Sequence, residues 1–520
     1  MKFGNLYPGY HAAQRPEAPA IIDGTSGRVL TYSELNDDAW RIAQFYRSLE
    51  LGSRDSVVLC LENSIEFVEF VWGALYAGLI YTPISTKQTA EEIAYIVQDC
   101  GASVLVVSSA LSAEIRASLS ILLPNVRVVE IEVGAGLPLS VSVRLPEPLP
   151  DAVEGMALLY SSGTTGKPKG IKPDPPKNGL GNNPTAMGGL ITQLFGFGSS
   201  SVYLSPAPLH HAAPLGYVLA VGQIGATAVI MRRFRPEDFL DQIAKYKVTH
   251  TQVVPTMFSR LLQLPVELRD RSDLNSLQCV IHAAAPCPPA VKLAMFDWLG
   301  PIIHEYYSGS EAVGFAYCSP QDWLSHPGTV GKSLVGAVHI LDDDGNEVPV
   351  GEEGVIYFEN PRRFEYLGDP EKTRRVYSEH GWGTFGDVGR LDDEGFLYLT
   401  DRRTDLIITG GVNVYPREVE EMLLLHPAVL DAAVVGLPDE DLGQRVAGVV
   451  SLRPGIVEGS DLARDLFDFC RSRLSHVKSP REIQFAPELP RTETGKLLRR
   501  VVRDTAKSRP SEFAHPQTQR

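Results

Sequence analysis

The sequence has few cysteines, no long uncharged apolar run and no excess of basic residues. Its six cysteines form no Cys-x-x-Cys pair and no metal-ligand spacing, which predicts reduced, mostly buried thiols and a cytoplasmic protein. Residues 69–80 are mostly apolar but carry a glutamate and are too few to cross a bilayer, so no integral membrane segment is expected. The first residues also lack the basic region and apolar core of a signal peptide.

Acidic residues outnumber basic ones, 63 Asp and Glu against 48 Lys and Arg, which gives a formal net charge of −15. This balance argues against a general affinity for nucleic acid or for anionic membranes, so any phosphate must be held by a local site. At 520 residues the chain is too long for one hydrophobic core, and its 44% hydrophobic and 21% charged content is that of an ordinary globular protein.

Helical and strand-like segments alternate along the first half of the chain. This alternation predicts an α/β fold, with a large N-terminal domain of parallel sheets covered by helices. Strands are expected at residues 56–61, 102–107, 226–231 and 248–254, and helices at residues 32–49, 65–79, 236–246 and after residue 255.

A glycine- and aspartate-rich hairpin at residues 391–400 marks the expected domain boundary. We expect the large domain to cover residues 1–401 and a small, mobile α+β domain to cover residues 402–520. The polar tail at residues 508–520 holds two prolines and is expected to be disordered.

The run at residues 160–170, Tyr-Ser-Ser-Gly-Thr-Thr-Gly-Lys-Pro-Lys-Gly, follows a short apolar stretch. A strand that ends in such a loop offers backbone amides, hydroxyls and two ammonium groups to one small volume, which is how proteins hold a polyphosphate. A Walker loop is excluded, because only two residues separate Gly163 from the pair Gly166-Lys167, and Pro168 follows.

This run resembles the phosphate loop of the adenylate-forming enzymes, which include acyl-CoA synthetases, firefly-type luciferases and peptide-synthetase adenylation domains. Matching segments continue in the family's order from residues 30–35 to Lys496. The resemblance implies that ATP joins a carboxylate as an acyl-adenylate with release of pyrophosphate, after which a thiol, usually that of coenzyme A, displaces AMP. It assigns the ATP phosphates to Ser161, Ser162, Gly163, Thr164, Thr165, Gly166, Lys167 and Lys169.

Residues 307–311, Tyr-Ser-Gly-Ser-Glu, are similar to the family's Tyr-Gly-x-Thr-Glu element. The match implies that Ser310 binds the α-phosphate, that Glu311 holds Mg²⁺ and that Tyr307 stacks beside adenine. A helix N-cap explains a hydroxyl residue beside an acid equally well, so that structural alternative stays open. Ser308 replaces the usual glycine near the expected acyl group.

Three further segments complete the implied nucleotide site. The backbone of Ala283, Ala284 and Ala285 resembles the segment that lines adenine, although an alanine run also suits tight packing. Asp387 matches the aspartate that binds the ribose hydroxyls, and Arg402 matches an arginine that assists there.

His211, in Pro-Leu-His-His-Ala, resembles the family's histidine beside the carboxylate and phosphate, where it acts as a gate rather than a proton shuttle. Its neighbour His210 raises the alternative of a metal site, but adjacent side chains diverge and no acidic cluster accompanies them.

The small domain carries the remaining expected residues. Lys496 matches the lysine that reaches the α-phosphate and carboxylate during adenylation, and the pair Gly410 and Gly411 resembles the glycines along which the thiol passes. Lys478 is a candidate contact for coenzyme A phosphates. In the family, one arrangement of the two domains cannot offer both Lys496 and the face of Gly410 and Gly411 to the same site. The resemblance therefore implies domain rotation about residues 402–405. Thr404 stands there in place of the usual Lys or Asp.

Three functions remain in competition: an acyl-CoA synthetase of the fatty-acid or aryl type, an adenylation enzyme that loads a carrier protein, and a nucleotide-binding homologue without catalysis. The acyl-CoA synthetase is favoured, with a small carboxylic acid, ATP, Mg²⁺ and coenzyme A as its expected ligands. The oligomeric state is open, with a homodimer as one option. Small or apolar candidate pocket positions predict an apolar monocarboxylate with an aliphatic chain or a ring system, at Ala212, Ala213, Gly216, Tyr217, Ser308, Gly314 and Phe315.

Overall fold

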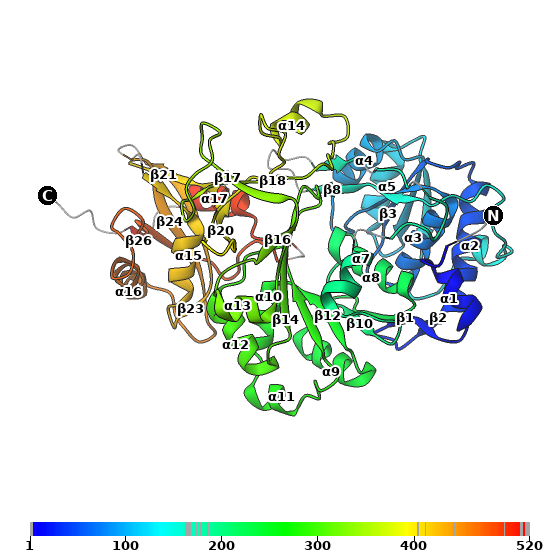
Figure 1. Cartoon of the computed structure of the whole chain (residues 1–520), viewed down its shortest axis with the longest axis horizontal. Coiled ribbons are helices and arrows are strands. Elements are labelled where there is room, and N and C mark those ends of the chain that lie inside the picture. Colours follow the sequence, from blue (N-terminus) through cyan, green and yellow to red (C-terminus); the bar gives the residue numbers. More distant parts are fainter. Residues whose placement is uncertain are drawn as a thin grey trace.

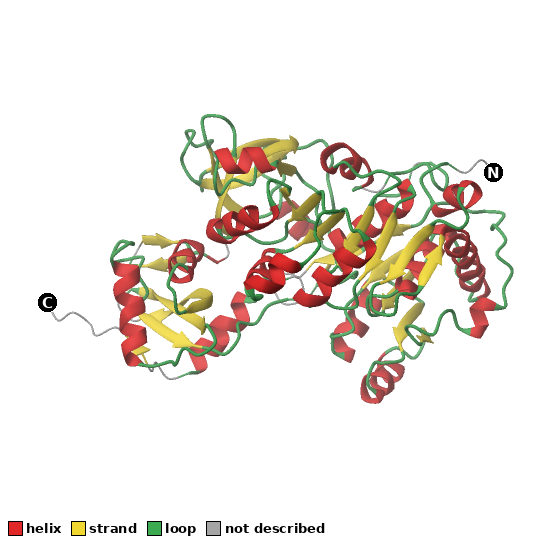
Figure 2. Ribbon diagram, turned by 90° about the horizontal axis from the view of Figure 1, so that it is seen from below, coloured by secondary structure: helices red, strands yellow, loops and turns green. Residues whose placement is uncertain are grey.

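The computed structural model describes residues 4–161, 168–172, 174–176, 178–184, 187–402, 405–410, 412–439, 442–492, 495–509 and 513–514. The N-terminal elements lie at one end of the long axis and the C-terminal elements at the other (Figure 1). Two large sheets form most of the first part, and a separate sheet forms the last part (Figure 2).

The larger of the two main sheets has nine strands, of which the central ones are parallel and the outer ones antiparallel. Their spatial order is β16 (Lys332–Val335), β15 (Phe315–Cys318), β14 (Ile303–Ser308), β13 (Cys279–His282), β12 (His250–Val253), β10 (Val202–Ser205), β11 (Thr227–Ile230), β1 (Pro19–Asp23) and β2 (Val29–Thr31).

The second main sheet is parallel throughout and has five strands. Val57 and Leu59 point into the core between the sheets, whereas Val58 and Cys60 point to the outer face, as the two-residue strand period requires. The spatial order is β6 (Arg127–Ile131), β5 (Val104–Ser108), β3 (Ser56–Cys60), β4 (Ile80–Pro83) and β7 (Met156–Ala157).

Helices fill the space between the two sheets and cover both outer faces. All 13 residues of α3 are buried, which explains why this helix is apolar apart from Glu66 and Glu69. The inner helices are α2 (Tyr32–Ser48), α3 (Ile65–Ala77), α7 (Gly188–Phe195) and α8 (Ala212–Ile224). The outer helices are α4 (Ala90–Asp99) and α5 (Ala113–Leu122) on the five-stranded sheet, and α9 (Pro236–Tyr246), α10 (Pro255–Leu262), α12 (Pro289–Leu299) and α13 (Pro320–Ser325) on the nine-stranded sheet. Shorter helices are α1 (Pro8–Gln14), α6 (Leu139–Ser142) and α11 (Val266–Arg271).

An antiparallel sheet of four strands leads toward the small domain. It consists of β17 (Ala337–Leu341), β18 (Gly354–Glu359), β19 (Asp387–Leu391) and β20 (Leu397–Arg402), with α14 (Pro370–Arg375) between β18 and β19. A separate antiparallel pair, β8 (Leu159–Ser161) and β9 (Lys169–Ile171), flanks the expected phosphate loop.

The C-terminal sheet alternates its apolar side chains between two faces. Ala432 and Val434 pack with α15 and α16, whereas Ala433 and Val435 pack with α17. Its strands are β21 (Ile407–Thr409), β22 (Val412–Val414), β23 (Val429–Asp439), β24 (Gly443–Leu452), β25 (Glu482–Phe485) and β26 (Phe513–Ala514), and its helices are α15 (Pro416–Leu424), α16 (Ser460–Arg471) and α17 (Arg499–Ser508).

The predicted fold class is confirmed, and each strand and helix expected from the alternating pattern is present with small shifts at its ends. Helix α2 begins at Tyr32 because Thr31 and Glu34 form a capping box. The tail differs in part from the expectation: Ser508 ends α17, and Phe513–Ala514 pair with β25. The domain boundary at residues 401 and 402 stays a prediction. All six cysteines are buried and free. Over the described ranges, no helix is both long and apolar enough to span a bilayer.

A buried ion pair joins α12 to β14. Lys292 Nζ lies 2.5 Å from Glu305 Oε2, and His282 Nε2 lies 3.3 Å from the same oxygen. Burial lowers the pKa of His282, so the imidazole is neutral near neutral pH and Lys292 supplies the compensating charge.

We predict that Lys292→Met destabilises the protein by about 3–5 kcal/mol, because it leaves the buried Glu305 carboxylate without its cation. The double variant Lys292→Met/Glu305→Leu removes both charges and is expected to recover most of the loss. Melting temperatures of the parent and both variants, measured at one protein concentration, check this. Equal melting temperatures for the single and double variants would contradict it.

Candidate active site

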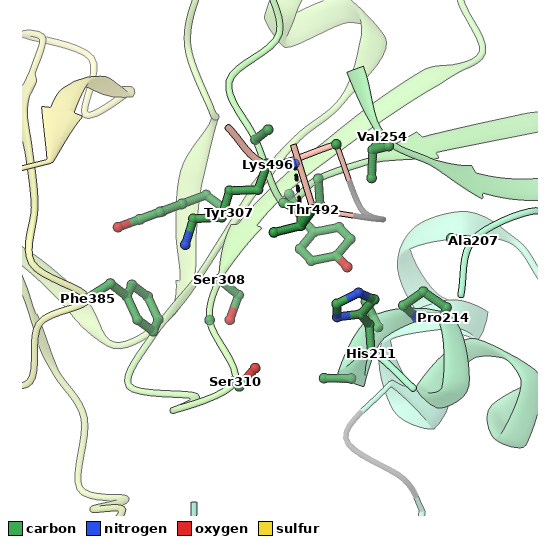
Figure 3. A pocket seen from close by; sticks show the side chains of 18 of the residues that line it. Ala207, His211, Pro214, Val254, Tyr307, Ser308, Ser310, Phe385, Thr492 and Lys496 are labelled. Carbon is green, nitrogen blue, oxygen red and sulfur yellow. Dashed lines mark hydrogen bonds between the residues drawn. The ribbon is translucent and has the colours of Figure 1, made fainter. Parts of the chain in front are cut away.

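A cleft of about 2710 Å³ opens where the carboxyl ends of the central strands meet the small domain. β10 leads to His211, β13 to Ala283 and β14 to Ser310 and Glu311, so the parallel sheet brings distant parts of the sequence to one edge. In Figure 3, Tyr307, Ser308 and Phe385 lie on one side of the cavity and His211 and Pro214 on the other, while Lys496 enters at the top of the view.

One wall of the cleft combines small residues with aromatic ones. The Tyr307 hydroxyl donates to Asp387 Oδ2 at 2.6 Å, and the Phe385 ring meets the Tyr307 ring edge-on with 5.5 Å between centroids. Ala283, Ala284 and Ala285 also line the cleft, with Ala284 in the left-handed region at φ 74°. A flat base can approach this wall closely, and the Asp387 carboxylate can accept hydrogen bonds from hydroxyl groups beside it.

A second part of the cleft gathers charged groups around Glu311. The Tyr366 hydroxyl donates to Glu311 Oε1 at 2.9 Å, and Lys169 Nζ donates to Asp369 Oδ2 at 2.8 Å. Burial and the neighbouring Lys169 ammonium lower the pKa of Lys372 to about 8. The sequence analysis missed Tyr366, Asp369 and Lys372, since an Asp-Pro pair before a short basic segment indicates only the start of a helix.

Glu311 fits the expected Mg²⁺ ligand in its donor chemistry. Its Oε1 is occupied by the Tyr366 hydroxyl, which orients the carboxylate and leaves Oε2 for a hard cation that also binds phosphate. Over the ranges the structure describes, no three His, Cys, Asp or Glu side chains form a metal cluster of their own.

His211 precedes the first turn of α8 and faces the cleft (Figure 3). Its ring lies 4.3 Å from that of His210 between centroids. Burial and the nearby Lys87 ammonium lower the pKa of His210 to about 4, so His210 is uncharged at neutral pH. An uncharged His210 supplies no charged phosphate contact, and His211 is partly exposed to the cleft, which suits a gate that swings.

A narrow apolar slot extends from His211 along one face of α8. Ala212, Leu215, Gly216, Leu219 and Gln223 recur every three or four residues on that face. At 1.5 Å rise per residue, they span roughly 16 Å. The opposing wall is formed by Leu75, Met187 and Leu190.

The far end of the slot is polar. Asn183 Nδ2 donates to Glu154 Oε2 at 2.5 Å, and Gln223 Nε2 donates to the Asn183 carbonyl at 3.1 Å. Burial raises the pKa of Glu154 to about 7. These hydrogen bonds join the segment at residues 178–184 to Glu154 and to α8 at this end of the slot.

Six of the seven candidate pocket positions line the cleft, and Tyr217 does not. Tyr217 is fully buried and stacks on Tyr203 with 5.6 Å between ring centroids. The sequence analysis was wrong there because Tyr217 lies on the face of α8 that packs against the nine-stranded sheet. Ser308 lines the cleft, and its hydroxyl donates to the Gly314 carbonyl at 2.8 Å.

Lys496 belongs to the small domain, and its loop is held against the large domain. Arg491 pairs with Asp431 at 2.7 Å and donates through Nη1 to the Gly495 carbonyl at 2.8 Å. Gly495 has φ 76°, and a Cβ placed on it would lie 2.2 Å from Thr256 Oγ1 on α10. Only glycine permits this approach, which puts Lys496 in the cleft.

Gly410 and Lys478, two of the residues expected to meet coenzyme A, lie outside the cleft lining. Gly410 donates its amide to the Leu442 carbonyl at 2.9 Å, and Lys478 pairs with Glu418 at 2.8 Å. Neither is among the described residues that line the cleft. Residues 162–167, Thr404 and Gly411 lie outside the described residues. Ser161 and Arg402 are described only as the backbone ends of β8 and β20.

Comparisons with known proteins cover both domains. A family model for AMP-binding enzymes matches residues 10–365, and a model for the AMP-binding enzyme C-terminal domain matches residues 418–496. The chain is similar to the long-chain-fatty-acid–CoA ligase FadD13 of Mycobacterium tuberculosis, with 29% identity over 95% of this chain and 96% of that protein. It is similar to the fatty acid–(acyl-carrier-protein) ligase ScoC of Streptomyces coeruleorubidus, with 30% identity over 95% of each chain. The solved structure of the anthranilate CoA ligase AuaEII with anthranoyl-AMP matches with a TM-score of 0.84 and 26% identity, over 96% of this chain and 98% of that chain.

We predict that Gly495→Ala withdraws Lys496 from the cleft, because the added methyl group collides with Thr256. Gly455→Ala is the matched control: Gly455 has a similar φ of 85° in the same domain, but nothing lies within 4 Å of its Cβ position. The distance between one fluorophore on each domain should increase in Gly495→Ala alone. An equal increase in both variants would show that backbone strain, and not the contact with Thr256, is responsible.

Proposed function

The chain belongs to the AMP-binding enzyme family and is an AMP-forming acid–CoA ligase, and we propose that its substrate is an apolar monocarboxylic acid. In the proposed reaction, ATP and the acid give an acyl-adenylate and pyrophosphate, and coenzyme A then takes the acyl group and releases AMP. The observation that carries the proposal is the meeting of Lys496, Glu311 and Asp387 in one cleft, although they come from separate parts of the chain.

The wall of Tyr307, Asp387 and the three alanines is suited to the nucleoside of ATP, with adenine against the alanine backbone and the ribose hydroxyls on Asp387. We expect the carboxylate of the acid between His211 and Lys496. Its oxygen attacks the α-phosphorus, the bond from that phosphorus to the bridging oxygen breaks, and the electron pair leaves with pyrophosphate. Lys496 and Ser310 offset the charge that converges there.

Mg²⁺ bound at Glu311 would neutralise charge on the phosphate oxygens. The Tyr366 hydroxyl fixes the orientation of Glu311, since it donates to one carboxylate oxygen. Burial and Glu311 raise the pKa of Tyr366, so the tyrosine keeps the proton that it donates.

The second half-reaction needs another arrangement of the domains. Lys496 lines the cleft while Gly410 and Lys478 do not, so the observed arrangement suits formation of the adenylate. We propose that the small domain turns about residues 402–405 after pyrophosphate leaves. That turn would withdraw Lys496 and bring the face of Gly410 and Gly411 to the adenylate for attack by the thiol.

The slot along α8 favours a long aliphatic acid or a fused-ring acid. Its walls are apolar from Ala212 to Leu219, roughly 10 Å of helix, which is more than a single benzene ring needs. No Lys or Arg occurs among the slot residues named above, so a second carboxylate would have no cation to meet it. The polar end at Glu154 and Asn183 would meet the far end of an acid that fills the slot.

A carrier protein is the second candidate acceptor, because ScoC is named for that activity and is as similar to this chain as FadD13. An enzyme that loads a carrier protein would use the same adenylation site. A panel of acids assayed for pyrophosphate and AMP release, with and without coenzyme A, tests both. Pyrophosphate without AMP turnover in the presence of coenzyme A would favour the carrier protein, and no acid-dependent pyrophosphate would overturn the proposed function.

We predict that Lys496→Ala lowers the rate of adenylate formation by about 10²–10³-fold, the scale for loss of one charge-stabilising group. Thioester formation from a supplied acyl-adenylate should be retained, because the lysine is needed only when phosphate and carboxylate meet. Lys507→Ala, an exposed lysine on α17 of the same domain, is the control. Equal losses in both half-reactions would contradict the rotation.

We predict that Gly216→Leu removes activity with long acids and retains it with short ones. The Cβ position of Gly216 lies 3.2 Å from Met187 Cγ, so a branched side chain closes the slot near its entrance. The ratio of kcat/KM between dodecanoate and butanoate measures this, with Gly189→Leu on the exposed start of α7 as control. An unchanged ratio would show that the acyl chain takes another route.

A further inference from the structure

Lys372 is a cation in the cleft that forms no ion pair with a carboxylate of the described residues, although Glu311 and Asp369 attract it from a greater distance. Over the described residues, no Asp or Glu oxygen lies within ion-pair distance of its Nζ, whereas the adjacent Lys169 pairs with Asp369 at 2.8 Å. Lys372 Nζ instead lies 4.3 Å from the centroid of the Tyr366 ring. The aromatic face provides partial compensation only, since a cation–π contact is weaker than a charge-assisted hydrogen bond.

Lys372 lies next to Lys169, and the Asp369 carboxylate that pairs with Lys169 offsets the repulsion between the two ammonium groups only in part. The two ammonium groups repel each other, and this repulsion adds to the effect of burial in lowering the pKa of Lys372. Both side chains line the cleft and are partly buried. An anion placed between them would reduce the repulsion, give Lys372 a charged partner and add a second partner to Lys169.

Glu311 indicates which anion fits this place. The Tyr366 side chain contacts Lys372 through its ring and Glu311 through its hydroxyl, so Lys372 lies beside the proposed Mg²⁺ ligand. In nucleotide sites the metal ion bridges the outer phosphate oxygens. An anion bound to Lys372 and Lys169 would therefore be the β- and γ-phosphates of ATP, which leave as pyrophosphate.

We propose that Lys372, together with Lys169, binds the pyrophosphate portion of ATP. As the bond between the α-phosphorus and the bridging oxygen breaks, the electron pair moves onto the leaving pyrophosphate, and the Lys372 ammonium stabilises that charge without transferring a proton. This inference rests on the proposed function, because it uses the same nucleotide site.

A role limited to helix structure does not account for this ammonium group. Asp369 caps α14 by accepting from the Lys372 backbone amide at 2.9 Å, and that contact needs only the main chain. Methionine at position 372 would retain the cap and the contact with Tyr366 and would lose only the charge.

The test compares ATP with AMP, because AMP lacks the phosphates that Lys372 is proposed to bind. Calorimetric Kd values for each nucleotide, with Mg²⁺ and without any acid, are measured for the parent, Lys372→Met, Lys372→Arg and Arg375→Met. Arg375 lies one turn along α14 and pairs with Glu371, so it controls for net charge on the same helix. Inhibition by added pyrophosphate provides a second readout that does not depend on the adenine pocket.

Lys372→Met should weaken binding of ATP and of pyrophosphate by about tenfold, the scale for one hydrogen bond to a charged group, and leave AMP binding unchanged. Lys372→Arg should retain most of the affinity, and Arg375→Met should match the parent. Equal ATP affinity in Lys372→Met and the parent would overturn the inference, as would equal weakening of ATP and AMP. A parent that binds neither nucleotide would overturn the proposed function instead.

Discussion

The contact of Gly495 with Thr256 determines whether the cleft is complete. It joins the main chain of Gly495 to the Thr256 side chain, a side chain at position 495 would prevent it, and it carries Lys496 from the small domain to the edge of the large one. Arg491 holds the same loop from within the small domain through Asp431 and the Gly495 carbonyl. The lysine is therefore fixed relative to both domains, and a turn of the small domain that broke the contact with Thr256 would remove it from the site.

The rest of the cleft depends on the nine-stranded sheet. Because β10, β12, β13 and β14 are parallel, the loops that follow them open at one edge, where His211, Ala284 and Ser310 meet. The buried pair of Lys292 with Glu305 joins α12 to β14 directly behind this edge. The scaffold thus places a largely apolar core under a polar site, and the slot along α8 leads away from that site between the two main sheets.

The charged side chains near Glu311 differ in how they are partnered. Tyr366 orients the carboxylate, Lys169 forms an ion pair with Asp369, and Lys372 contacts the Tyr366 ring and forms no ion pair among the described residues. Of these two neighbouring lysines, Lys169 is already paired with a carboxylate, whereas the Lys372 ammonium group gains its first close charged partner when a ligand binds. Sequence motifs alone cannot predict which lysine forms an ion pair, because both residues are lysines in short polar segments.

The sequence by itself determined the fold class, the alternating strands and helices of the large domain, and the family resemblance that assigned Glu311, Asp387 and Lys496. These features follow from local periodicity and from short motifs in a fixed order. The tertiary structure alone decided that Tyr217 packs in the core, that Glu154 and Asn183 meet at the end of the slot, and that Lys372 lies beside Glu311. Each of these depends on which face of a helix meets a sheet, or on a loop far away in the chain. Such contacts leave no periodic pattern in the sequence, because folding brings together residues that are far apart in the chain and have no fixed spacing.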